Sequence, residues 1–150
     1  MIRVGIIGSI GSGKTFISKL FRCPVFNADN EVKYLYKYNK ECFKKLKKKL
    51  PKFIRSFPIK KKELINSISS DSKNLKKISS VVHPMVRKRM NLFLKKNRNS
   101  KMIVLDIPLL VENRLYKKKD VLILVKSDRN KIIKRLKKRR NYNKIILKKL

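Results

Sequence analysis

A glycine-rich stretch near the N-terminus has the residue types and the spacing that bind phosphate. It reads GSIGSGKT and fits the pattern G-x-x-x-x-G-K-[ST], with Gly8 first and then Gly13, Lys14 and Thr15. Glycine lets the backbone turn tightly, so that successive N–H groups point at a bound anion. The order predicts that Lys14 contacts the β- and γ-phosphates of a nucleotide and that Thr15 ligates Mg²⁺. A chance glycine-rich turn is the alternative, although all four glycines of the chain lie between residues 5 and 13.

The segments around this phosphate loop, residues 8–15, have the patterns of a strand and a helix. The apolar run at residues 2–7 suits a buried parallel strand, and apolar residues then recur at helical spacing over residues 16–21. Further short apolar runs predict strands at residues 24–27, 102–107 and 121–125, the last two of them central in a parallel sheet.

The chain between the second and third predicted strands is helical in pattern and strongly basic. Pro51, Pro58 and Pro84 are expected to divide this part into short helices. We therefore expect an α/β domain in which residues 31–101 form a helical insertion.

The remaining segments would form a nucleotide-binding core. Residues 1–30 supply the first two strands and the phosphate loop, and residues 102–150 supply the other strands and a basic helical end. The chain stops within this helical pattern at Leu150, so we expect either a fragment of a longer protein or a shortened domain.

The charge of the chain is extreme and needs a cautious interpretation. Lys and Arg number 43 against 9 Asp and Glu, for a net charge of +34, which by itself suggests a nucleic-acid-binding protein. The lysines are nevertheless spread over the whole length, and the abundance of Lys, Asn and Ile with a single alanine, Ala28, is typical of a genome poor in G and C. We therefore expect a solvated basic surface with no specific nucleic-acid partner, and only nonspecific, salt-sensitive adhesion to RNA.

The cysteines and the hydropathy of the chain indicate where in the cell the protein acts. The two cysteines, Cys23 and Cys42, lie in no zinc-binding pattern and suit a reduced environment. No stretch approaches eighteen apolar residues, the length of a membrane-spanning helix. These features favour a cytoplasmic protein without membrane contact, which we expect to be a monomer or a weak oligomer.

Two of the few acids end predicted strands. Asp106 stands where a Walker-B carboxylate binds Mg²⁺, and Asp29 stands where a carboxylate could accept a proton from an attacking hydroxyl. For both residues the alternative is a capping role at the next turn or helix.

Four segments in order and spacing resemble the dephospho-CoA kinase family over essentially the whole chain. They are the loop GSIGSGK, the pair Ala28-Asp29, the run VHPMVR at residues 82–87 and the run LDIPLLVEN at residues 105–113. The resemblance implies a P-loop NTPase-type three-layer α/β/α fold with a parallel sheet and a helical substrate-binding insertion. It also implies that ATP, with Mg²⁺, phosphorylates the ribose 3′-hydroxyl of dephospho-CoA.

The resemblance assigns roles to individual residues. Asp29 would be the general base, and Asp106 would hold the metal together with Thr15. The ATP phosphates would be bound by Gly8, Gly11, Ser12, Gly13, Lys14, Thr15 and Phe16.

The acceptor would be bound by the predicted insertion and the loop that follows the third strand. His83 and Arg87 would hold the CoA-like substrate, and Glu112 and Asn113 would line the same pocket. The basic segment near residues 126–145 would be the lid, with Arg139 as the residue that closes over ATP. For this segment a solvated basic helix is the alternative.

One departure from the family and two rival functions stay open. Members often have an acid where this chain has Asn27. Another small-molecule or nucleotide kinase would share the loop and the lid and differ in its acceptor pocket. A non-enzymatic protein that adheres to RNA would keep the loop as a remnant.

Overall fold

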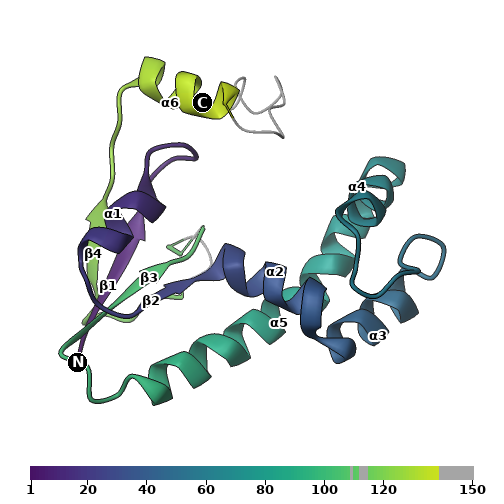
Figure 1. Ribbon diagram of the computed structural model, residues 1–150, viewed down its shortest axis with the longest axis horizontal. Coiled ribbons are helices and arrows are strands. Elements are labelled where there is room, and N and C mark those ends of the chain that lie inside the picture. Colours follow the sequence, from purple (N-terminus) through teal and green to yellow (C-terminus); the bar gives the residue numbers. More distant parts are fainter. Residues whose placement is uncertain (109, 112–114, 139–150) are drawn as a thin grey trace. The chain divides into compact units, whose positions relative to one another are not determined.

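The computed structural model describes residues 1–108, 110–111 and 115–138 (Figure 1). The chain divides into two compact units: a sheet unit made of Met1–Asn27 and the chain from Asn97 onward, and a helical unit made of Ala28–Lys96.

In the sheet unit the described residues form four parallel strands. In chain order they are β1 (Ile2–Ile7), β2 (Val25–Asn27), β3 (Met102–Asp106) and β4 (Val121–Leu124), and their order in the sheet is β2-β3-β1-β4. All four were predicted from short apolar runs, and these predictions are confirmed. The carboxyl ends of β1, β2 and β3 therefore meet at one edge of the sheet, where the phosphate loop also begins.

The prediction that the fourth strand is central was wrong. Among the described strands β4 pairs only with β1, and Val121, Leu122 and Leu124 remain 48%, 36% and 54% exposed. An apolar run predicts that a strand forms, but its number of neighbours depends on which other segments reach the sheet.

The described part of the sheet unit has two helices. Helix α1 (Lys14–Leu20) packs on β1, β2 and β3, next to a buried cluster that includes Val4, Ile6 and Val104. Helix α6 (Arg129–Lys137) follows β4 and begins at Asp128, whose carboxylate accepts hydrogen bonds from the backbone N–H groups of residues 130 and 131. Such an N-cap satisfies donors that the first helical turn leaves open.

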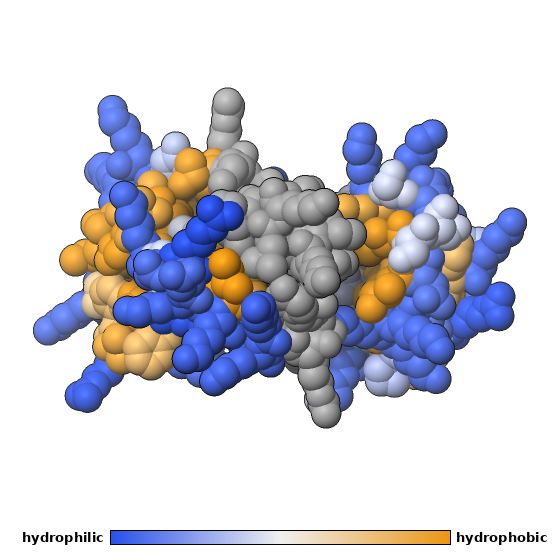
Figure 2. Space-filling model, turned by 90° about the horizontal axis from the view of Figure 1, so that it is seen from above, coloured by the Kyte–Doolittle hydropathy of each residue, from blue (hydrophilic) through white to orange (hydrophobic). Residues whose placement is uncertain are grey.

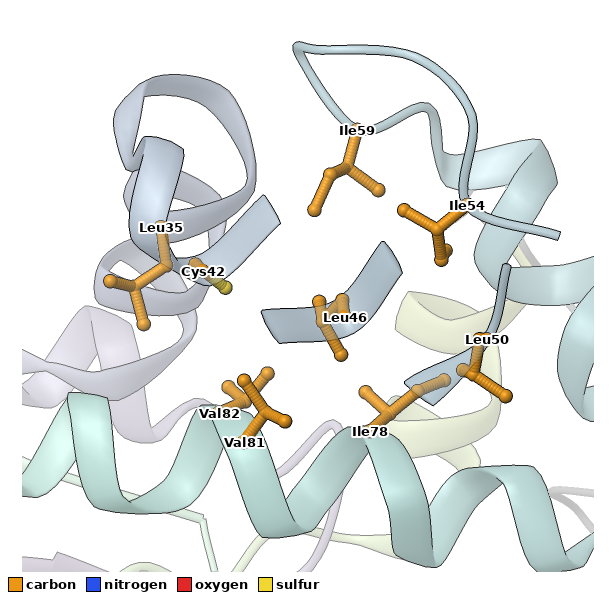
Figure 3. Close-up of a cluster of buried hydrophobic side chains, with 9 residues drawn as sticks. All are labelled: Leu35, Cys42, Leu46, Leu50, Ile54, Ile59, Ile78, Val81 and Val82. Atoms are coloured by element: carbon orange, nitrogen blue, oxygen red, sulfur yellow. The ribbon is translucent and has the colours of Figure 1, made fainter. Parts of the chain in front are cut away.

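The helical unit consists of α2 (Ala28–Tyr38), α3 (Lys40–Lys49), α4 (Lys61–Ser70) and α5 (Lys73–Lys96). Helix α5 packs against the other three. Apolar side chains from α2, α3, the chain after α3 and α5 itself form a common core (Figure 3). This core is formed by Leu35, Cys42, Leu46, Leu50, Ile54, Ile59, Ile78, Val81 and Val82. Six of the ten residues of α3 are lysines.

Pro51 and Pro58 lie between helices, as predicted, but the prediction for Pro84 was wrong. Pro84 lies inside α5, which runs unbroken over 24 residues. Proline removes one backbone donor and usually kinks or ends a helix. Here buried residues on both sides of it, Val82 before and Met90 after, are packed into the unit, and this tertiary packing outweighs the local cost.

Many hydrophilic side chains are exposed. In Figure 2 the blue, hydrophilic side chains project at many places on the visible face, beside orange, apolar ones. Within the described part of the chain, no helix is long and apolar enough to cross a membrane.

Candidate functional site

The phosphate loop connects β1 to α1. At two of its positions, both the backbone conformation and the closeness of neighbouring atoms favour glycine. Gly8 has a φ of 144°, and a Cβ there would lie 2.4 Å from the carbonyl oxygen of Val125. Gly11 has a φ of 81°, and a Cβ there would lie 3.1 Å from Cγ2 of Ile132. A side chain at either position would be strained in conformation; at position 8 it would also collide with the backbone after β4, and at position 11 it would crowd α6.

The loop contains a cationic side chain and a buried hydroxyl, those of Lys14 and Ser12. The Nζ of Lys14 donates hydrogen bonds to the carbonyl oxygens of Gly8 and Ser9, both at 2.9 Å. The Ser12 side chain is 4% exposed, and its Oγ has no hydrogen-bond partner among the described residues. A buried hydroxyl without a partner costs free energy, so a phosphate oxygen at this loop would supply what the protein lacks.

The end of the loop is joined to β3 by a side-chain hydrogen bond between residues far apart in the sequence. The Oγ1 of Thr15 donates to Oδ2 of Asp106 at 2.8 Å, and the Asp106 residue is 3% exposed. A hydroxyl and a carboxylate are hard oxygen ligands of the kind that Mg²⁺ prefers, so these two residues fit the ion that the motif implies. Among the described residues no group of three or more His, Cys, Asp and Glu could hold a metal ion, so the described donor set is small.

Asn27 completes this group and was not predicted as part of it. Its Nδ2 donates to the same Oδ2 of Asp106 at 2.6 Å. The register of the sheet explains the contact, because Asn27 on β2 is the direct partner of Asp106 on β3. The sequence showed only that each of these two predicted strands ends near a polar residue, and the register that pairs them follows from the assembled sheet.

Helix α6 reaches the phosphate loop through Arg135. Its Nη1 donates to the carbonyl oxygens of Gly11 and Ser12 at 3.2 and 3.0 Å, and to Oγ of Ser127 at 3.1 Å. The sequence placed Arg135 only in a basic lid segment. The structure gives it a defined partner, the backbone of the loop.

The predicted base lies at the start of the helical unit. Asp29 is exposed and stands second in α2, which begins at Ala28, so it is not the N-cap of that helix. A carboxylate in the first turn of a helix is stabilised by the helix dipole.

The two predicted acceptor-binding residues share one face of α5. His83 and Arg87 are four residues apart in the helix and both are exposed. Their neighbour Arg89 has a different role, since its Nε donates to Oε2 of Glu31 and its guanidinium lies 4.0 Å from the centre of the Tyr34 ring. Arg89 thus ties α5 to α2.

Three predicted site residues, Glu112, Asn113 and Arg139, lie outside the described residues. Phe16 is described, but its side chain is 68% exposed and its backbone N–H donates to the carbonyl oxygen of Gly13 at 2.9 Å. Phe16 thus lies in the first turn of α1, directly after the phosphate loop.

Comparison with known proteins assigns the family. A model of the dephospho-CoA kinase family matches residues 2–149. The chain belongs to the dephospho-CoA kinase family. The family match, together with the parallel sheet and its helices, confirms the three-layer α/β/α fold of the P-loop type.

Individual relatives agree with this membership. A dephospho-CoA kinase from Rhizobium etli is 33% identical over 133 residues, which are 85% of this chain and 64% of the relative. One from a Wolbachia of Brugia malayi is 33% identical over 130 residues, or 83% of this chain and 67% of the relative. The chain thus spans about two thirds of the length of these relatives.

A solved structure shares the fold. The crystal structure of a Thermus thermophilus protein matches with a TM-score of 0.74 and 28% sequence identity, covering 98% of this chain and 77% of that one.

Proposed function

We propose that this protein transfers the γ-phosphoryl group of ATP to the ribose 3′-hydroxyl of dephospho-CoA, which gives coenzyme A and ADP, in the last step of coenzyme A synthesis in the cytoplasm. The observation that carries the proposal is the hydrogen bond between Thr15 and Asp106, which joins a phosphate loop to a strand-end carboxylate in a chain of this family. The transition state of phosphoryl transfer is loose, so such an enzyme acts mainly by positioning and by neutralising charge.

The sheet unit would bind the nucleotide. The N–H groups of the loop and the ammonium group of Lys14 would contact the phosphates, Lys14 exchanging its two carbonyl partners for phosphate oxygens. Thr15 and Asp106 would hold Mg²⁺, which when bound neutralises charge on the transferred group. Arg139 would close over the same group from the lid.

The helical unit would bind the acceptor. The guanidinium of Arg87 suits a bidentate contact with the pyrophosphate of dephospho-CoA, and the imidazole of His83 lies on the same face one turn earlier. Glu112 and Asn113 would line the same acceptor pocket.

Asp29 would accept the proton of the attacking hydroxyl. Replacing it with Asn keeps its size but removes the basic oxygen, so we expect the Asp29→Asn variant to lose about 10²- to 10³-fold in kcat with little change in ATP binding. Steady-state kinetics with both substrates measure this. Glu41→Gln, at an exposed acid of α3, is the matched control, and equal kcat values for the two variants would remove Asp29 from the role of base.

The reaction itself is tested by the release of ADP from ATP and Mg²⁺ with different acceptors. Dephospho-CoA, adenosine and a nucleoside monophosphate are added separately, and the products are separated by chromatography. We expect stimulation only by dephospho-CoA, with coenzyme A formed. Stimulation by a nucleoside monophosphate alone would instead identify a nucleotide kinase, and ATP binding without transfer to any acceptor would contradict the proposal.

A further inference from the structure

The carboxylate of Asp106 accepts hydrogen bonds from two side chains. Thr15 Oγ1 and Asn27 Nδ2 both donate to the same oxygen, Oδ2, at 2.8 and 2.6 Å. The register that pairs Asn27 with Asp106 belongs to the backbone of the sheet, so any residue at position 27 stands directly opposite this carboxylate.

A neutral donor at position 27 has a different effect from an acid of the same shape. An Asp there would bring a second carboxylate oxygen to within hydrogen-bond distance of Asp106, and two such groups repel unless a cation or a proton lies between them. Asn27 removes that repulsion and adds a hydrogen bond, so the group is stable without a bound cation.

We propose that Asn27 is a positioning residue that leaves Asp106 as the one carboxylate of this site among the described residues, so that a divalent cation binds together with ATP and not before it. The inference rests on the proposed function, since it assumes that the loop binds ATP. The small donor set among the described residues supports it, because one carboxylate and one hydroxyl leave most coordination positions to be filled. The net charge of +34 adds to this effect, because it repels free cations while it attracts the nucleotide.

The test is a titration of the protein with Mn²⁺ in the absence of nucleotide. Electron paramagnetic resonance measures the concentration of the free ion at each step. The samples are the wild type, Asn27→Asp and the control Asn99→Asp, which adds the same charge at an exposed turn outside the site. We expect Asn27→Asp to bind one Mn²⁺ at least about tenfold more tightly than the wild type and the control, because affinity rises with the number of carboxylate ligands. Equal affinities in all three proteins would overturn the inference.

Repeating the titration with a non-hydrolysable ATP analogue shows whether the cation binds together with the nucleotide or before it. The wild type should then bind Mn²⁺ at least about tenfold more tightly than without nucleotide, because the phosphates supply the missing oxygens. Wild-type binding that is equally tight with and without the analogue would also overturn the inference.

If Asn27→Asp does not fold, a variant with the two residues exchanged decides the question. Asn27→Asp combined with Asp106→Asn keeps one carboxylate and one amide across the same register pair. Recovery of the fold, with Mn²⁺ binding no tighter than in the wild type, would attribute the defect to the second carboxylate and support the inference. Failure of this variant as well would contradict it. Because these measurements involve no acceptor, lack of transfer to dephospho-CoA would refute the proposed reaction and leave this result standing.

Discussion

The two units hold their polar residues in place by different means. In the sheet unit, backbone geometry and hydrogen bonds between side chains fix them: Thr15 and Asp106 are 91 residues apart in sequence and yet hydrogen-bonded to each other. In the helical unit, an apolar core fixes the helices, and His83 and Arg87 are exposed on one of them. The difference teaches that the polar residues of the sheet unit depend on local stereochemistry, whereas the positions of His83 and Arg87 depend on the stability of the core against which their helix packs.

This contrast predicts which substitutions alter chemistry and which alter stability. A change in the phosphate loop should affect catalysis while the protein stays folded. A change in the helical core should affect folding first and catalysis only as a consequence.

The largest effect is expected from Lys14→Ala. The variant loses the only side-chain cation of the loop, so we expect kcat for phosphoryl transfer to fall by about 10³-fold or more. Its melting temperature should stay close to that of the wild type, because the hydrogen bonds from Nζ of Lys14 to the carbonyl oxygens of Gly8 and Ser9 lie near the surface. Lys19→Ala, at an exposed lysine of the same helix, is the control. If both variants lose activity equally, the loop is not the nucleotide site.

A core substitution in the helical unit should have the opposite profile. Leu46 is completely buried in the middle of the cluster in Figure 3, so Leu46→Ala should lower the free energy of unfolding by about 2–5 kcal/mol. Leu75→Ala, at a leucine that is 52% exposed, should cost far less. Unfolding in urea measures both. Equal losses would mean that the cluster does not stabilise the unit.

A smaller effect is expected at alkaline pH, and again in the helical unit. Burial raises the pKa of the Cys42 thiol from 9.0 to about 11 and that of the Tyr36 hydroxyl from 10.0 to about 12. Both groups are held neutral in the folded state and ionise more easily when unfolded. Their contribution to stability is therefore complete below pH 9 and is lost as the pH rises through these raised values.

The Cys42 contribution can be isolated by comparing two pH values. The free energy of unfolding should fall less between about pH 8 and about pH 10.5 in Cys42→Ala than in the wild type, since the variant has no thiol to ionise. The variant should be less stable at both values, because it leaves a cavity. An identical fall in the two proteins would show that the thiol is not responsible.

Much of the sheet unit could be predicted from the sequence, because its loop and its strands each require particular residue types at particular positions. Gly8 and Gly11 are needed for the shape of the loop, and short apolar runs marked all four strands. Two contacts could not be predicted. Asn27 meets Asp106 through a register that only the assembled sheet determines, and Arg135 is one cation among many until its helix packs on the loop.

The helical unit was less predictable because tertiary packing overrides local preference. Pro84 predicts a helix end, yet α5 continues through it, held by buried residues on either side. His83 and Arg87 are likewise exposed because α2, α3 and α4 pack against other residues of α5.

The division of work between the units is tested most directly by steady-state kinetics of Arg87→Ala with both substrates varied. Lys88→Ala, at the next exposed cation of α5, is the matched control, and a melting curve confirms that both variants are folded. We expect the KM for dephospho-CoA to rise about tenfold or more, as for the loss of a charge-assisted phosphate contact, while the KM for ATP stays unchanged. An equal rise in the KM for ATP, or no change in either constant, would contradict the assignment of the acceptor to the helical unit.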